Sequence, residues 1–231
     1  MNVLSRQIAE RHPDWHVEPV DLQKLLEPID PVHRLTLKLT GSLKRWLVPV
    51  ASRLTLAPLQ AQDIYNNALK RGATRGMGAI LPILQSFIRR YAPQIEALLD
   101  QRWRQPETRR PDLVVSVIPN FNGVMFGALR AFDPEIPYLT VMTDMVDCQP
   151  HFWMEDQDQY MICGTPKAFE QALATGFYAP EKIFQVSGML LRDSFYAPPG
   201  PASLSRTALG LAPDRPTAII MFGGNGSARA T

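Results

Sequence analysis

The residues best suited to chemistry are Thr143 and Asp144, which end the apolar run 136–142, IPYLTVM. If this run is a strand of a parallel sheet, the pair lies at the carboxyl edge, where open α/β sheets bind their ligands. A carboxylate in that position can accept the proton of an attacking hydroxyl group. The alternative is that Asp144 caps the turn after the strand.

The loop after this strand holds a histidine and large aromatic side chains, among them His151 and Trp153. Such a loop indicates either a wall of a binding cleft or packing over the edge of the sheet. A metal site is not predicted, because one histidine among carboxylates matches no ligand spacing. Cys148 and Cys163 belong to no Cys-x-x-Cys motif, so no disulfide framework is expected.

Two further stretches could bind anions. A glycine-rich turn follows the apolar run 217–222, and its amides could hold a phosphate or make an ordinary turn; its residues are Gly223, Gly224, Asn225, Gly226 and Ser227. The second stretch, GMLLRDSFY, begins at Gly188. Its Arg192 could bind a phosphate or carboxylate, or pair with a neighbouring aspartate.

The formal net charge of +2 is too small to indicate nucleic-acid binding by itself. The basic residues are nevertheless concentrated in residues 31–62, which contain no acidic residue and interleave cations with leucines. This composition is typical of a segment that docks on a membrane surface, or of surface helices with an apolar inner side. The residues assigned to docking are Arg34, Lys38, Lys44, Arg45 and Trp46.

Around these candidates, strand and helix signals alternate. Apolar runs predict strands over 111–119, 136–144, 158–165 and 181–188. Amphipathic runs predict helices over 1–11, 122–132 and 166–176, the last closed by Gly176. Residues 76–103 predict one or two helices, since Pro82 and Pro93 are tolerated at a first turn or a kink. A further short strand is predicted over 15–22. Near-continuous apolar strands joined by helices indicate an α/β fold, a Rossmann-like parallel sheet with helices on both faces.

Composition divides the chain into three parts. Residues 1–197 hold the alternating elements and form one predicted domain. Residues 198–216 begin with a run rich in proline and glycine, which predicts a linker followed by a short helix. Residues 217–231 contain the first strand and the glycine-rich turn of a second Rossmann-like domain.

The order of these motifs resembles a known group of enzymes. The stretches PDLVVSVIP, TVMTDMVDCQPHFW, CGTPKAFEQALATGFYAPEKIFQVSGMLLRDSF and GGNGS follow one another as in the monogalactosyldiacylglycerol synthase and processive diacylglycerol glucosyltransferase group. This group is part of glycosyltransferase family 28, whose GT-B fold has two Rossmann-like domains facing a cleft. Leu190 and Leu191 replace the usual Pro-Val pair at the hinge between the domains.

The resemblance implies a role for each candidate residue. Asp144 would be catalytic, and the acceptor would contact Thr143, His151, Trp153 and Asn120. Donor phosphates would bind residues 223–227, and the hinge would include Gly188 and Arg192. The implied reaction is transfer of a hexose from a UDP-sugar to diacylglycerol with inversion, without a metal or other cofactor. Galactose or glucose as donor, and single or processive transfer, stay open.

The resemblance also sets expectations about location and completeness. The basic segment would hold the protein peripherally on the cytoplasmic inner face of an anionic membrane, with no nucleic-acid partner. Members of the group open with a strand and a GGGHxxA loop and close with a full UDP-sugar domain. We therefore expect a truncated, inactive form. The alternatives are a non-catalytic acceptor and membrane-binding subunit that needs a separate donor-domain chain, and an unrelated α/β binding domain.

Overall fold

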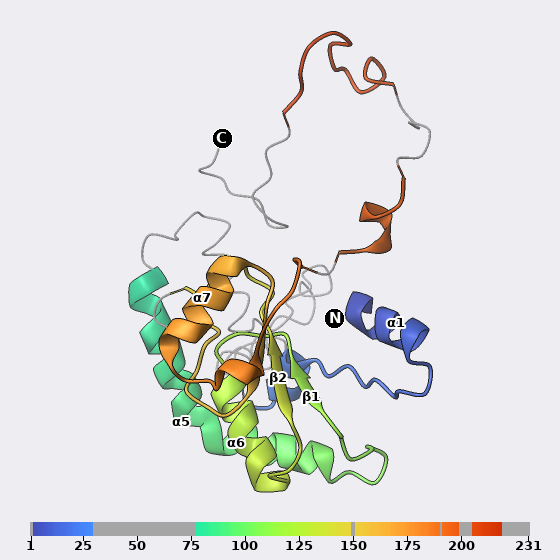
Figure 1. Ribbon diagram of the computed structural model, residues 1–231. Coiled ribbons are helices and arrows are strands. Elements are labelled where there is room, and N and C mark those ends of the chain that lie inside the picture. Colours follow the sequence, from blue (N-terminus) through green and yellow to red (C-terminus); the bar gives the residue numbers. More distant parts are fainter. Residues whose placement is uncertain (1, 30–76, 149–150, 190, 199–204, 219–231) are drawn as a thin grey trace, which may run out of the picture.

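The computed structural model describes residues 2–29, 77–148, 151–189, 191–198 and 205–218 (Figure 1). The helices are α1 (Asn2–Arg11), α2 (Leu22–Leu26), α5 (Met77–Trp103), α6 (Asn122–Phe132) and α7 (Pro166–Thr175), with short 3₁₀ turns at Pro180–Lys182 and Asp193–Phe195. The strands are β1 (Val114–Ser116), β2 (Tyr138–Val141), β3 (Tyr160–Cys163) and β4 (Ile183–Gln185). The basic segment 31–62 and the glycine-rich turn 223–227 lie outside the described residues.

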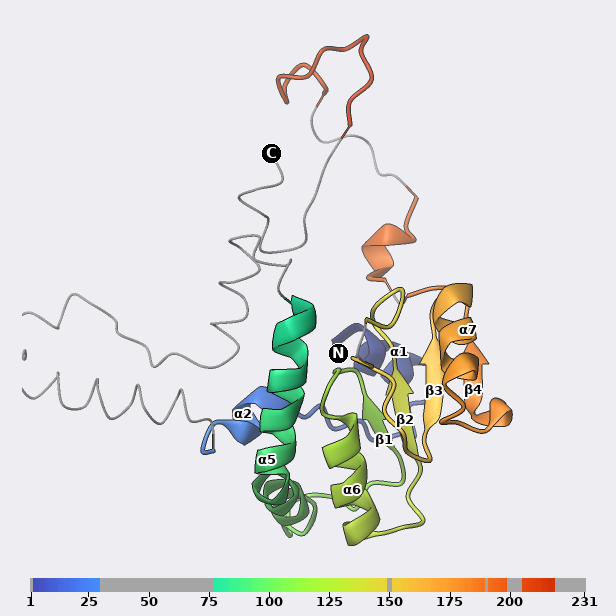
Figure 2. The same ribbon diagram turned by 90° about the vertical axis from the view of Figure 1, so that its left-hand side faces the viewer.

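The four strands form one parallel sheet in the order β1-β2-β3-β4. In the register of the sheet, Leu139 of β2 pairs with Tyr160 of β3, and Met161 of β3 pairs with Ile183 of β4. Figure 2 shows the strands side by side, with α6 and α7 as crossover helices. Helices α5, α6 and α7 lie on one side of the sheet and α1 on the other (Figure 1). The predicted α/β class with a Rossmann-like parallel sheet is confirmed.

Burial alternates along the strands. Tyr138 and Thr140 of β2 are buried, whereas Leu139 and Val141 between them are only half-buried. β1 and β4 each also contain an exposed apolar side chain. Val115 keeps 39% of its surface exposed and Phe184 keeps 46%. The apolar sequences predicted strands that are buried on both faces. Within the described residues the strands are instead only partly buried: successive side chains point to opposite faces of the sheet, and one face is less covered than the other.

Helix α5 is one continuous element that runs through Pro82 and Pro93. It packs on α6, and the two helices share a core with β2 whose buried members include Ile95, Leu99 and Leu129. Burying each such aliphatic side chain stabilises the fold by roughly 1.5–3 kcal/mol. The packing of α5 on α6 therefore supplies much of the stability of this half of the molecule.

Helix α7 begins and ends where the sequence predicts. The side chain of Thr165 accepts a hydrogen bond from the amide of Ala168 at 3.1 Å, which is an N-cap. Pro166 follows at the first helical position. Gly176 ends the helix in the left-handed conformation with φ of 68°, which other residues adopt at a cost.

The N-terminal region matches the sequence only in part. The predicted helix over 1–11 is present as α1. The short strand predicted over 15–22 is wrong, since this stretch contains no strand. Asp21 instead caps α2 by accepting the amides of Gln23 and Lys24 at 3.1 and 3.4 Å. The alternation that indicated a strand comes from an irregular connection that ends in a helix cap.

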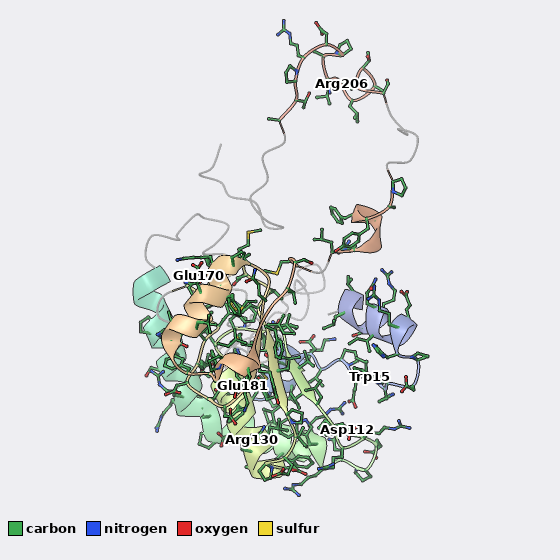
Figure 3. The ribbon with its side chains drawn as sticks, in the orientation of Figure 1. Trp15, Asp112, Arg130, Glu170, Glu181 and Arg206 are labelled. Atoms are coloured by element: carbon green, nitrogen blue, oxygen red, sulfur yellow. The ribbon has the colours of Figure 1, made fainter. Side chains whose placement is uncertain are left out.

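All parallel strands end at the same edge, and the loops that follow them meet there. Asp112 and Arg130 mark the opposite edge, at the start of β1 and the end of α6 (Figure 3). The loops after β1 and β2 are therefore at the carboxyl edge, where Thr143 and Asp144 were expected. The amide of Asn120, in the loop after β1, donates a hydrogen bond to the carbonyl of Phe152, in the loop after β2, at 2.9 Å.

Candidate functional site

Asp144 and Trp153, both predicted site residues, are in direct contact. The indole nitrogen Nε1 of Trp153 donates a hydrogen bond to Oδ2 of Asp144 at 2.7 Å. Trp153 is 1% exposed, while Asp144 is exposed to solvent. A buried ring therefore holds an exposed carboxylate in a fixed direction through a charge-assisted hydrogen bond. Thr143 is exposed beside it.

Asp147 organises the turn that carries His151. Its Oδ1 accepts the amide of Trp153 at 2.8 Å, and its Oδ2 lies 3.7 Å from Nδ1 of His151. Burial raises the pKa of the Asp147 carboxyl, although the Trp153 amide and the charge of His151 oppose this effect. The sequence contained no signal that set Asp147 apart from the neighbouring acidic residues, and its role was missed.

Asn120 and His151 share an unusual backbone conformation. They are the described non-glycine residues with positive φ, at 65° and 43°. The amide Nε2 of Gln85, on α5, donates to Oδ1 of Asn120 at 3.2 Å and to the carbonyl of His151 at 3.3 Å. The amide of Asn120 donates to the carbonyl of Phe152 at 2.9 Å. The structure thus brings these two predicted residues together, and strained backbone of this kind clusters at functional sites.

Glu155 binds the N-terminus of α6. Its Oε2 accepts the amide of Gly123 at 3.0 Å, and the residue before the helix, Phe121, offers no side-chain cap. The positive end of the helix dipole favours a carboxylate there. Burial raises the pKa of the Glu155 carboxyl, and hydrogen bonds from the amides of Gly123 and Asn122 oppose the shift. The loop after β2 is therefore fixed to α6 by a side chain that the sequence did not single out.

A buried polar network holds the returning end of the same loop. Thr140 donates to Oε1 of Gln159 at 2.9 Å, and Nε2 of Gln159 donates to the hydroxyl of Tyr178 at 3.3 Å. The Tyr178 hydroxyl donates to the carbonyl of Glu155 at 2.9 Å. On the other side, the hydroxyl of Tyr138 donates to Oδ1 of Asn122 at 2.9 Å. Satisfied buried networks make a site rigid.

The other predicted residues are separate from this cluster or outside the described residues. Gly188 follows β4 with φ of 147°, in the region that favours glycine. Arg192 is exposed, and its carbonyl accepts the amide of Phe195 at 2.9 Å. The donor residues 223–227 and the docking residues of segment 31–62 are not among those described.

No described helix is long and apolar enough to cross a membrane. The described residues contain no group of three or more His, Cys, Asp or Glu side chains that could hold a metal ion.

The fold and this edge define a class of protein, an α/β domain with a Rossmann-like parallel sheet and a rigid polar site at its carboxyl edge. No family model and no solved structure matches the chain. Curated proteins do match. The chain is 32% identical to a probable monogalactosyldiacylglycerol synthase of Glycine max over 120 residues, which cover 51% of the chain and 22% of that protein.

Two more relatives show the same similarity. A probable monogalactosyldiacylglycerol synthase 2 of Oryza sativa subsp. indica is 30% identical over 50% of the chain and 24% of its own length. Monogalactosyldiacylglycerol synthase 1 of Arabidopsis thaliana is 29% identical over 51% of the chain and 22% of its own length. The chain thus matches less than a quarter of the length of these relatives. The resemblance to the monogalactosyldiacylglycerol synthase group is confirmed.

Proposed function

We propose that the chain is the acceptor-side part of a glycolipid glycosyltransferase, which transfers a hexose from a UDP-sugar to diacylglycerol with inversion. The observation that carries this proposal is the fixed Asp144 carboxylate at the carboxyl edge of the sheet, in a chain similar to monogalactosyldiacylglycerol synthases. The names of these relatives describe a galactolipid synthase, and a glycolipid synthase needs a group that contacts the acceptor hydroxyl.

The geometry of the site suits an acceptor hydroxyl group. Asp144 is exposed, and its Oδ2 accepts a hydrogen bond from the indole of Trp153. Its carboxylate therefore presents a hydrogen-bond acceptor to solvent in a fixed direction. Thr143 lies next to it, and His151 and Asn120 come from the loops tied together by Gln85. In this proposal Asp144 contacts the hydroxyl, and the remaining residues line the acceptor site. Fixed polar groups lower the cost of orienting a substrate.

The proposed donor-binding and membrane-binding segments lie outside the described residues, so their roles are argued from the sequence. The amides of residues 223–227 would bind the phosphates of the UDP-sugar, and the leaving UDP would carry away the electron pair of the broken bond. The basic segment 31–62 would dock the protein peripherally on an anionic membrane surface, which brings the lipid acceptor to the site.

The proposed function is tested with the protein made from its complete coding sequence. It is incubated with UDP-galactose or UDP-glucose and vesicles that contain diacylglycerol, and the lipid product is analysed. We expect a hexosyl-diacylglycerol whose anomeric configuration is opposite to that of the donor. Hydrolysis of the UDP-sugar without a lipid product, or no turnover with either donor, contradicts the proposal.

A further inference from the structure

We propose that Asp147 and His151 form a proton-accepting pair, in which the exposed imidazole takes the proton of the acceptor hydroxyl and the buried carboxylate orients the imidazole. The pair rests on the proposed function, and it adds a proton acceptor to the oriented carboxylate of Asp144. Nδ1 of His151 lies 3.7 Å from Oδ2 of Asp147, and the two side chains are 45% and 5% exposed. This distance is an ion-pair separation, and catalytic contacts of this kind commonly shorten when substrate binds.

The carboxylate of the pair is held from several directions. Oδ1 of Asp147 accepts the amide of Trp153 at 2.8 Å. The side chain of Gln171, on α7, accepts the amide of Asp147 at 2.9 Å and donates to its carbonyl at 3.1 Å. Both the backbone and the side chain of Asp147 are therefore fixed, which is what an orienting carboxylate requires.

The backbone and the ring of His151 are also held in place by neighbouring residues. His151 has φ of 43°, a conformation that is unfavourable for a residue other than glycine and persists where the surroundings hold it. Gln85 holds its carbonyl at 3.3 Å, and the ring of Phe177 meets the imidazole edge to face with centroids 5.3 Å apart. The contacts of Gln85 and Phe177 therefore hold an exposed ring next to a buried carboxylate.

The charged groups around the pair are mostly carboxylates. Asp144 and Asp147 both act electrostatically on Cys148, whose thiol pKa is raised first by burial and then by these charges. Glu155 lies within range of Asp147 and of Arg89 on α5. Among these groups the carboxylates of Asp144, Asp147 and Glu155 outnumber the one cation, Arg89. Imidazole also ordinarily changes its charge close to neutral pH.

The proton transfer balances without another reactant. The carboxylate of Asp147 favours the tautomer with the hydrogen on Nδ1, which leaves the lone pair of Nε2 on the opposite side of the ring. The hydroxyl oxygen of the acceptor attacks the anomeric carbon and its O–H bond breaks, with the proton passing to Nε2. The bond from the anomeric carbon to UDP breaks and its electron pair leaves with UDP. The imidazolium then releases its proton to water.

The test is the pH dependence of kcat/KM for the full-length protein, measured for the wild type, His151→Asn, Asp147→Asn and the control His16→Asn. Asparagine is chosen because it tolerates positive φ, so His151→Asn keeps the local backbone. We expect His151→Asn to lose about 100-fold or more in rate and the ascending limb of the profile. Asp147→Asn moves that limb to lower pH, since the imidazolium loses its anion. His16, exposed near α1, leaves the profile unchanged.

A second measurement separates chemistry from folding. The ring proton signals of His151 are titrated by NMR in the wild type and in Asp147→Asn, where we expect the midpoint to move to lower pH. An unchanged midpoint, or a His151→Asn protein with the rate and pH limb of the wild type, overturns the pair while the proposed function stands. A wild type that makes no glycolipid overturns both.

Discussion

Trp153 donates its indole hydrogen to Asp144 at 2.7 Å, nine residues away in the sequence, and this bond links a buried aromatic ring to the exposed carboxylate of the site. The same tryptophan donates its backbone amide to Asp147 at 2.8 Å. One residue therefore fixes both carboxylates of the loop. This arrangement explains why so large a side chain occupies a loop at the edge of the sheet.

The contact between Trp153 and Asp144 predicts a coupling energy. We expect Trp153→Phe and Asp144→Asn to interact by about 1 kcal/mol in the free energy of unfolding, because the first change removes the indole donor and the second removes the negative charge that strengthens the same hydrogen bond. The measurement is a double-mutant cycle by urea unfolding. Trp15→Phe, an exposed tryptophan, is the control and should be additive with Asp144→Asn. Additivity of Trp153→Phe with Asp144→Asn would refute the stated role of the indole.

Glu155 predicts a pH dependence of stability. Burial raises the pKa of its carboxyl above the ordinary value of 4.5, so the folded state holds the proton more tightly than the unfolded state does. The protonated Glu155 carboxyl therefore contributes to the free energy of unfolding below pH 4.5, and this contribution is lost as the pH rises through the raised pKa. We expect Glu155→Gln, which cannot ionise, to lose less stability than the wild type as the pH rises above 4.5. Exposed Glu181, at the opposite edge in Figure 3, supplies the control Glu181→Gln, whose slope should match the wild type.

Two glycines of α6 give a matched pair. An added Cβ at Gly123 would lie 3.0 Å from Oε1 of Glu155, and at Gly127 it would lie 3.2 Å from Oε1 of Glu96. Alanine in a helix interior gains up to about 1 kcal/mol over glycine, and Gly127 is interior whereas Gly123 lies in the first turn of α6. Glu96 can swing aside, whereas Glu155 is held by the helix amides. We expect Gly127→Ala to be more stable than Gly123→Ala by about 1 kcal/mol in thermal and urea unfolding. The reverse order would show that Glu155 is not fixed.

The proposed docking segment predicts binding to vesicles. We expect the protein to co-sediment with vesicles of anionic lipid, and replacement of Arg34, Lys38, Lys44 and Arg45 by glutamine to weaken this binding by about 1 kcal/mol for each charge that contacts the surface. The control replaces an equal number of exposed basic residues elsewhere, namely Lys24, Arg90, Arg109 and Lys167. Equal sedimentation of the two variants would remove the segment from docking.

The sequence predicted the sheet and the crossover helices well because these depend on local patterns. The apolar runs marked the four strands, and Gly176 marked the end of α7. The strand predicted over 15–22 failed because alternation alone cannot distinguish a strand from an extended connection before a helix cap. Asp21 was the signal for that cap.

The candidate site could be predicted only in part. Asp144, His151 and Trp153 stood out by type and position, but their contacts depend on residues distant in sequence. Gln85 lies 66 residues from His151, and no local pattern announces that contact. Asp147 and Glu155 are distinguished from the other acidic residues of the loop by burial alone, which only the fold reveals.

The most direct measurement of the central claim is the rate of hexose transfer to diacylglycerol by the full-length wild type, Asp144→Asn and the control Asp112→Asn. Asp112 is exposed at the opposite edge of the sheet (Figure 3), so its replacement should leave the rate unchanged. We expect Asp144→Asn to lower kcat/KM by about 100-fold, because the acceptor hydroxyl loses its oriented anion. Equal rates for Asp144→Asn and the wild type would contradict the placement of the acceptor at this edge.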